Sequence, residues 1–303
     1  MWGANADQSS SGWTRGRIAA AALIAAAVSA GIGVVAGAGS RGPAAPAITP
    51  VFAAGLDLER LALGAERADP VRPRVVPTEA AIRSASRYAA ARAGTVSFAT
   101  VDSRGRLRGH SVDRRFTAAS VVKAMVLAAE LRRLARADEP IDGATDQLLK
   151  AMITQSDNDA ADTVYERIGD AGMHSVARRA GMTGFTIAGH WGNAQITAAD
   201  LARFFAELEE MFPRRHVKYG QSLLGSVIPS QSWGIPAAAG ETWAARLKGG
   251  WLPEKALVHQ AAELRERGGA RRVGMAILTD EQPSHEYGVE TVRGVAARLL
   301  AAD

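Results

Sequence analysis

The sequence predicts an α+β fold in which one antiparallel sheet is built from both ends of a domain and the segment between them forms a helical lobe. Alternating apolar and polar residues near 95–112 and 256–278 predict strands at the two ends. Between them, residues 120–210 carry a series of helix patterns. Hydrophobic residues make up 47% and charged residues 22% of the 303 residues, which is enough apolar material for a buried core.

The first elements follow from local start and stop signals. Pro77-Thr78-Glu79 begins a helix that is expected to run to about residue 93 and to stop at Gly94. A strand over residues 95–101 leads into the turn Asp102-Ser103-Arg104-Gly105, so the return strand is expected near residues 106–112. Residues 120–136 are apolar nearly all round, which predicts a central buried helix.

The remaining elements complete the domain. Helices are expected near residues 145–156, 160–168 and 172–180, and Thr197 and Asp200 form a capping box before a helix over 201–210. The late strands lie near residues 256–264 and 272–278, joined by Arg267-Gly268-Gly269, and a helix over 287–302 closes the chain. Residues 77–303 are therefore predicted to form one core or two tightly packed lobes.

The N-terminus carries a segment with the length and flanks of an export signal. Residues 18–38 contain no charge, and Arg15 and Arg17 precede them. At about 1.5 Å per residue, a helix of this length spans about 30 Å, the thickness of a bilayer core. The flanking arginines predict that this end stays inside and the rest is exported.

Three interpretations of this segment remain: an uncleaved membrane anchor, a signal peptide cut after Ala36-Gly37-Ala38, or a buried Ala-rich helix. We expect export, so residues 1–38 are an export signal or membrane anchor, and the membrane is a partner of the chain through them. Residues 39–76 are rich in proline and small residues and are expected to form a linker. The catalytic domain is then expected outside the cytoplasm, secreted or anchored.

Composition excludes several classes of function. Lys and Arg number 36 against 31 Asp and Glu, and this surplus is scattered, so nucleic acid is not an expected partner. The absence of cysteine excludes disulfides, thiolate metal sites and a cysteine nucleophile. The six histidines show neither H-x-x-x-H nor H-x-H spacing, so we expect no metal site, and no motif calls for a cofactor. Nothing in the sequence fixes the oligomeric state.

Ser120-Val121-Val122-Lys123 is the first motif with chemical meaning. Positions i and i+3 of a helix share a face, so the hydroxyl and the amine can approach one another. Among apolar neighbours a lysine is desolvated, its pKa falls, and it can act as a base towards a serine. The plainer interpretation is that Ser120 caps a helix and Lys123 extends to water.

Two further motifs follow in order. Ser156-Asp157-Asn158 is by itself a plausible turn and helix cap, and Lys248-Gly249-Gly250-Trp251 is by itself a plausible glycine-rich turn entering a strand. The three motifs occur in this order in a domain predicted to begin with strands, continue with helices and end with strands. This combination is hard to attribute to chance.

With these motifs, residues 77–303 resemble the serine β-lactamase and penicillin-binding protein superfamily, and class A β-lactamases in particular. The resemblance implies a five-stranded antiparallel sheet flanked by helices, a smaller all-helical lobe, and an active site between them. It also implies an exported serine hydrolase that forms an acyl-serine intermediate with β-lactam amides or peptidoglycan-like D-alanyl peptides.

The resemblance assigns a role to each motif residue. Ser120 is the implied nucleophile, Lys123 its base or proton relay, and Ser156 the group that passes the proton to the leaving nitrogen. Lys248 is implied to lend positive charge to Ser156 and to a substrate carboxylate. The implied substrate-binding residues are Asn158, which holds a side-chain amide of the substrate, and Gly249, Gly250 and Trp251 on the third motif. The backbone N–H groups of Ser120 and Trp251 are implied to form the oxyanion hole.

Three departures from class A enzymes set the alternatives. Residues 169–200 contain no glutamate to activate a deacylating water; Asp170 and Asp200 are their only acids, and Asp200 is better explained as a cap. His190 in the loop 184–196 is an alternative base, although a single histidine in a loop is more often a surface residue. Gly249 removes a hydroxyl that usually helps to bind the substrate carboxylate, and the stretch between the first two motifs is shorter than in class A enzymes.

The alternatives are therefore a penicillin-binding D,D-peptidase-like protein that releases its acyl group slowly, or a catalytically silent, membrane-tethered domain that binds the cell wall. Intact Ser120, Lys123, Ser156 and Asn158 argue against a silent cleft. The tryptophans are expected in the core or in the walls of the cleft.

Overall fold

The computed structural model describes residues 76–301, apart from the side chain of Lys255. The predicted export segment and nearly all of the predicted linker lie outside this range. Within it, no helix combines the length and the apolar character needed to cross a membrane.

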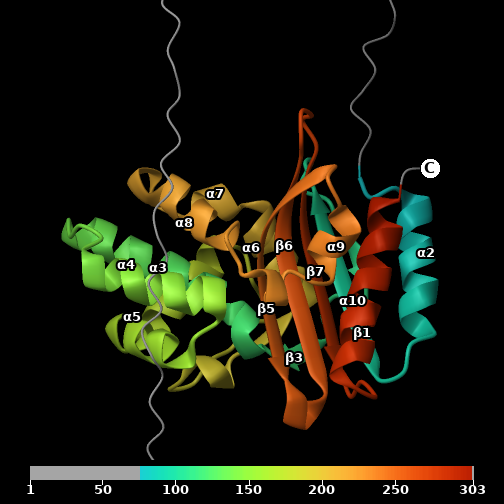
Figure 1. The fold of residues 1–303 in the computed structure, drawn as a ribbon, viewed down its shortest axis with the longest axis horizontal. Coiled ribbons are helices and arrows are strands. Elements are labelled where there is room, and N and C mark those ends of the chain that lie inside the picture. Colours follow the sequence, from blue (N-terminus) through green and yellow to red (C-terminus); the bar gives the residue numbers. More distant parts are fainter. Residues whose placement is uncertain (1–75, 302–303) are drawn as a thin grey trace, which may run out of the picture. The chain divides into compact units, whose positions relative to one another are not determined.

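Strands from both ends of the domain form one antiparallel five-stranded sheet, as the sequence predicts (Figure 1). Its order is β2-β1-β7-β6-β5. In that order the strands are Leu107–His110, Thr95–Asp102, Arg272–Asp280, Leu257–Glu266 and Trp243–Leu252. Strand β5 was not predicted from the pattern of residues, because Gly249-Gly250 interrupts the side-chain alternation that identifies a half-buried strand.

Both faces of the sheet are covered. On β1, Val96 and Phe98 point to a core shared with helices α2, α9 and α10, while Ala99 and Val101 point to the core on the opposite face. This alternation is the period of two that a strand imposes. Those helices are Glu79–Ala90, Ile235–Ala239 and His285–Leu300. Helix α2 begins at its predicted cap, where the Thr78 side chain accepts from Ala81 N–H.

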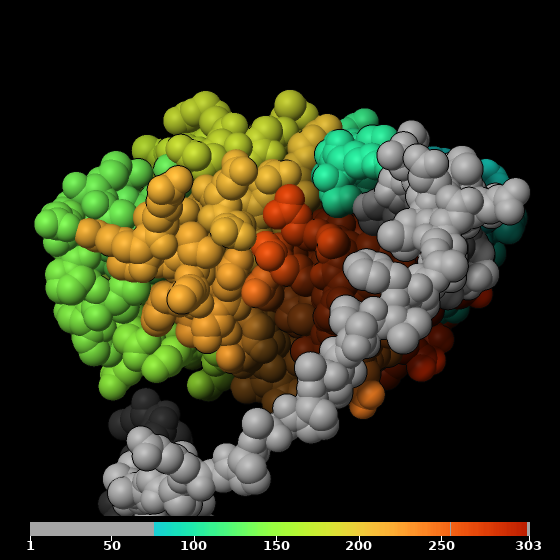
Figure 2. All heavy atoms as spheres, turned by 90° about the horizontal axis from the view of Figure 1, so that it is seen from above, coloured from blue at the N-terminus to red at the C-terminus, as the bar shows by residue number. Residues whose placement is uncertain are grey.

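The helical lobe packs against the other face. Its two central helices, α3 and α5, contact one another, and α6 contacts β1 and β7 (Figure 1). Helices α3 to α8 are Lys123–Ala137, Gly143–Lys150, Asn158–Arg179, Ala198–Ala206, Leu208–Met211 and Val217–Leu224. Figure 2 shows green to gold residues of this lobe beside the orange and red residues of the late strands.

Several boundaries differ from the prediction for local reasons. The two helices expected around residues 160–180 are merged as α5, which is interrupted at Gly169, where φ is 55°. The helix expected from residue 120 begins as a 3-10 turn, η1 (Ala119–Val122), and α4 continues into a π turn, η2 (Ala151–Gln155). The predicted capping box of Thr197 and Asp200 is present at the start of α6. The segments before η1 and α6 pair as a small two-stranded sheet of β3 (Arg115–Thr117) and β4 (Gln195–Thr197). These strands are too short to show an alternation of apolar and polar residues in the sequence.

Candidate active site

Ser120 lies in η1, the turn that connects β3 to the buried helix α3. The turn is fixed by Ala118 N–H, which donates to Ala194 O at 2.9 Å, and it begins with Ala119 at φ 48°. A non-glycine residue in this left-handed region is uncommon and strained, and such residues cluster at functional sites. The Ser120 side chain is half-buried, and its hydroxyl forms no hydrogen bond with any residue between 76 and 301.

Strand β5 lies directly against this turn. A Cβ added to Gly250 would lie 2.7 Å from Ser120 N and 2.8 Å from Val121 N. Contacts this short are repulsive, so only glycine permits the strand to approach the backbone of the proposed nucleophile. The third motif is therefore a strand with a glycine at its closest approach, and not the glycine-rich turn that its composition also allowed.

Lys123, on the first turn of α3, is fully buried and directs its ammonium group at the second motif. Its Nζ donates to Ser156 O at 2.6 Å, to Asp157 O at 3.1 Å and to Asn158 Oδ1 at 2.7 Å. These three acceptors match the three donors of an ammonium group. The interpretation in which Lys123 extends to water is wrong, because the side chain has no solvent exposure.

The second motif is both a helix cap and a part of this cluster. Ser156 follows the π turn with φ 63°, and Asp157 caps α5 by accepting from Ala160 N–H at 2.7 Å. The left-handed residue ends one helix and the cap begins the next, so the chain turns sharply beside Lys123. The plain explanation of Ser-Asp-Asn as a turn and cap is thus correct, and the same turn places Ser156 at the site.

Lys248 reaches Ser156 from the sheet. Its side chain is also fully buried, and its Nζ donates to Ser156 Oγ and to Gly249 O, each at 2.9 Å. Three segments far apart in the sequence therefore meet around Ser156. The structure brings Lys123, Ser156, Asn158 and Lys248 together through hydrogen bonds, and Gly250 brings Ser120 against the same strand.

Burial sets the electrostatics of the two lysines. It lowers the pKa of Lys123 to about 8, an effect that the nearby carboxylates of Asp157 and Asp162 partly oppose. It lowers the pKa of Lys248 to about 7, and the positive charge of Lys123 lowers it further. In the described part of the chain, neither lysine forms an ion pair with a carboxylate. Buried charges are normally paired, so two unpaired lysines at one site point to function.

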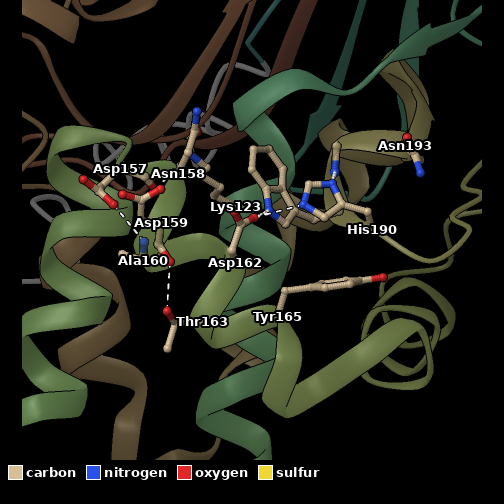
Figure 3. Close-up of polar contacts among 12 residues, drawn as sticks. Lys123, Asp157, Asn158, Asp159, Ala160, Asp162, Thr163, Tyr165, His190 and Asn193 are labelled. Carbon is tan, nitrogen blue, oxygen red and sulfur yellow. Dashed lines mark hydrogen bonds and ion pairs between the residues drawn. The ribbon is translucent and has the colours of Figure 1, made fainter.

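Asp162 and Trp191 form a further side of this cluster that was not predicted from the sequence. Trp191 presents its ring to Lys123, with Nζ 4.7 Å from the ring centroid, and donates from Nε1 to Asp162 Oδ1 at 2.6 Å. Figure 3 shows Asp162 and His190 turned toward one another. Asp162 stands one helical turn after Asn158, and this spacing was the available signal. His190 Nε2 also contacts Asp162 Oδ1, at 2.9 Å, while its Nδ1 accepts from Gly192 N–H. Both ring nitrogens of His190 are thus engaged.

The two acids predicted as the only ones between residues 169 and 200 are both occupied. Asp170 accepts from the Tyr165 hydroxyl and from Gly189 N–H. Asp200 is fully buried, and its carboxylate accepts from Thr197 N–H in the capping box of α6 and from Thr183 N–H. Neither carboxylate is a free base at the site, and the described residues contain no group of three or more potential ligands that would suit a metal ion.

Aromatic rings border the third motif. The Trp233 ring packs against Gly249, where an added Cβ would lie 3.5 Å from it. Trp251 is half-buried on the same strand, with its ring centroid 6.4 Å from that of Trp233. The assignment of the Ser120 and Trp251 N–H groups to an oxyanion hole stays a prediction.

Comparisons with solved structures find the same fold in known proteins. The chain is similar in fold to the β-lactamase from Sphaerobacter thermophilus, with a TM-score of 0.64 at 19% identity over 73% of this chain and 95% of that chain. It is also similar to the class A β-lactamase from Mycobacterium abscessus, with a TM-score of 0.63 at 20% identity over 73% of this chain and 98% of that chain. A PBP-A variant in an acyl-enzyme complex with penicillin G gives a TM-score of 0.63 at 16% identity over 72% of this chain and 94% of that chain.

At the level of sequence, no curated protein matches. The model of the Beta-lactamase enzyme family matches residues 142–302, a segment that contains the second and third motifs. This match covers more than half of the chain, and the mixed fold with its five-stranded antiparallel sheet is that of the structural neighbours. The chain belongs to the beta-lactamase enzyme family.

Proposed function

We propose that this protein is a serine hydrolase that is acylated at Ser120 by β-lactam amides or related D-alanyl peptides. The observation that carries the proposal is the convergence of two buried, unpaired lysines on Ser156, beside a serine in a strained turn. A structural role alone would not repay the cost of burying two cations close together. A mutant of PBP-A, a protein of similar fold, is known as an acyl-enzyme complex with penicillin G.

The proposed steps use these residues as follows. Ser120 Oγ attacks the carbonyl carbon of the amide, and neutral Lys123 takes the hydroxyl proton. The C–N bond then breaks, Ser156 passes a proton to the leaving nitrogen, and Ser156 is reprotonated through its hydrogen bond with Lys248. The products are the amine and an ester on Ser120. Water then hydrolyses the ester to the acid and restores Ser120.

We propose that this last step is slow. The protein offers no glutamate between residues 169 and 200, and Trp191 presents its ring to Lys123 where water would otherwise have access. This arrangement favours the chemistry of a penicillin-binding protein, in which the adduct persists. A catalytically silent domain would form no adduct at all.

We also propose that the chain is exported through residues 1–38, with the membrane as its partner where this segment is retained. The uncharged stretch behind Arg15 and Arg17 supports this proposal. Mass spectrometry of the protein recovered from cells distinguishes an intact anchor from cleavage after Ala38. Recovery of the uncleaved chain from the soluble cytosolic fraction would contradict export.

Intact-mass spectrometry with benzylpenicillin tests the acylation. We expect one covalent adduct on the wild-type protein and none on Ser120→Ala, because the hydroxyl is the attacking atom. The melting temperature of Ser120→Ala should stay close to that of the wild type, since the hydroxyl forms no hydrogen bond with any described residue. Ser103→Ala, in the exposed hairpin turn, is the matched control and should label normally. Labelling of Ser120→Ala would overturn the nucleophile assignment.

A further inference from the structure

One buried side chain connects the five-stranded sheet to the segment that carries Ser120, and the steps proposed above do not use it. His259 lies on β6 and is fully buried. It is paired with Gly250 of β5, and residues opposite one another in a sheet face the same side. Gly250 meets Ser120 N on that side, and the His259 ring extends there too. A buried polar ring is normally hydrogen-bonded, so its partners show what it holds.

Each ring nitrogen of His259 has a backbone partner, and the two partners fix the tautomer. Thr279 N–H donates to Nδ1 at 3.1 Å, and a backbone N–H can only donate. Nδ1 therefore carries no proton, and Nε2 carries the proton that it donates to Thr117 O at 3.0 Å. Burial lowers the pKa of His259 to about 4, although the hydrogen bonds with Thr117 and Val258 partly oppose this effect. The ring is thus neutral at physiological pH.

The carbonyl that His259 holds lies at the entry to the nucleophile turn. Thr117 ends β3 and stands three residues before Ser120. The preceding residue, Phe116, packs its ring edge-on against His259, with centroids 5.6 Å apart and an interplanar angle of 87°. The following residue, Ala118, donates its N–H to Ala194 O. The sheet therefore holds this segment through His259, while the loop before α6 holds it through Ala194.

We propose that His259 is a positioning residue for Ser120, and that its hydrogen bond to Thr117 O sets the place of the turn η1 against β5. This inference rests on the proposed acylation of Ser120 and adds a residue that lies outside all three motifs. Ala119, between Thr117 and Ser120, has φ 48°, and such strain persists only where the surrounding structure holds the backbone on both sides. Helix α3 holds the turn after Ser120, and His259 supplies a restraint before it.

Two amide substitutions separate the two hydrogen bonds of the ring. In His259→Gln, the amide nitrogen takes the place of the ring Nε2 and can still donate to Thr117 O, but Thr279 N–H loses its acceptor. In His259→Asn, the shorter side chain places its oxygen where Nδ1 was and can accept from Thr279 N–H, but it does not reach Thr117 O. Each variant keeps one hydrogen bond and leaves one backbone group without its partner, so the two are matched in polarity.

Acylation of the full chain by benzylpenicillin at several concentrations, followed by intact-mass spectrometry, gives the maximum rate and the half-saturating concentration. We expect His259→Asn to lower the maximum rate by about 10- to 100-fold, because a nucleophile displaced by about 1 Å loses this much, and to leave the half-saturating concentration unchanged. His259→Gln should stay close to the wild type in both quantities.

A control separates positioning from stability. Leu264→Val shortens a fully buried side chain on the opposite face of the same strand, so it should lower the melting temperature and leave the maximum rate unchanged. Equal losses of rate in His259→Asn and His259→Gln, or rates that follow the melting temperatures of all variants, would overturn the inference. His259 would then only stabilise the fold.

Amide hydrogen exchange tests the positioning without acylation. Residues 118–123 should exchange faster in His259→Asn than in the wild type, and at the wild-type rate in His259→Gln. If benzylpenicillin does not label the wild type, the proposed hydrolase fails, and this exchange pattern still decides the role of His259. Equal exchange in the two variants would overturn that role, whatever the acylation result. Should His259→Asn fail to fold, His259→Met, which fills the place of the ring without a donor, replaces it in both experiments.

Discussion

At the scale of single residues, the most informative side chains are the buried lysines. Each lies among apolar groups that penalise its charge, yet each directs its Nζ at the same short turn, Lys123 at Ser156 O and Lys248 at Ser156 Oγ. Burial lowers both pKa values into the range in which a neutral amine exists at physiological pH. The cluster therefore provides a base without any histidine, and His190, with both nitrogens hydrogen-bonded, is not needed for that role.

The lowered pKa values predict how acylation depends on pH. Lys123 accepts a proton only in its neutral form, which forms as the pH rises through its pKa of about 8, whereas Lys248 donates a proton only in its charged form, which is lost above its pKa of about 7. The rate of adduct formation should therefore pass through a maximum between these two values and fall on both sides of it. Intact-mass spectrometry of samples quenched at successive times, at saturating benzylpenicillin, gives the rate of adduct formation at each pH. Lys123→Ala should lower the maximum rate by about 100-fold or more, as removal of a general base does. A profile that is flat between pH 6 and 9 would show that neither lysine titrates in the rate-limiting step.

At the scale of elements, the site depends on how closely strand β5 approaches the turn η1. The strand is at the edge of the sheet, so one side of its backbone pairs with β6 and the other remains for the site. Gly250 is the point of contact, since a Cβ there would collide with Ser120 N and Val121 N. The glycines of the third motif thus have different consequences. Gly250 allows the approach of two backbones, and Gly249 leaves room for the Trp233 ring.

Gly250→Ala tests this contact. The added methyl group should push η1 away from β5, and because displacement of a nucleophile by about 1 Å can cost about 100-fold, we expect acylation to fall by that order. Gly143→Ala is the matched control, since a Cβ at this helix start meets nothing within 4 Å. Its acylation rate should stay at the wild-type value. Rates for both variants that equal the wild type, with unchanged melting temperatures, would show that the approach of β5 is not critical.

At the scale of the whole described domain, the site forms where the sheet and the helical lobe meet. Ser120 and Lys123 enter from the start of α3, Ser156 from the turn before α5, and Lys248 from β5. The loop that carries Trp191 is attached to α5 through Asp162, and the Trp191 ring covers one side of Lys123. The cover over Lys123 is thus a property of the assembled lobes and of no single element.

Trp191→Ala should shorten the life of the adduct. Removing the ring opens a path for water to Lys123 and to the ester, so we expect the mass of the adduct to disappear at least several-fold faster than in the wild type. Trp191→Phe, which keeps a ring but loses the Nε1 hydrogen bond to Asp162, is the matched control and should behave more like the wild type. A longer-lived adduct in Trp191→Ala would show that the ring assists deacylation and does not block it.

Much of this protein was determined by local sequence. Caps and turns fixed several element ends, among them Thr78 at α2 and the Thr197–Asp200 box at α6, because a cap is recognised from residues within one turn. The strand patterns at the two ends of the domain predicted the antiparallel sheet. The three motifs predicted which residues lie together in one site. Residues 120–136 are apolar nearly all round, which predicts a buried helix. The same surroundings predict that Lys123 is desolvated.

Contacts between distant segments were decided only by the tertiary structure. Strand β5 was invisible in the sequence because glycines hide its alternation, and its pairing with β6 supplies the missing information. The partnership of Asp162 with Trp191 joins residues 29 positions apart, and that of Ser156 with Lys248 joins residues 92 positions apart. Side-chain type and local spacing do not specify such distances. They arise when the sheet and the helical lobe bury their apolar faces together, and that packing also creates the low polarity that shifts the pKa values of both lysines.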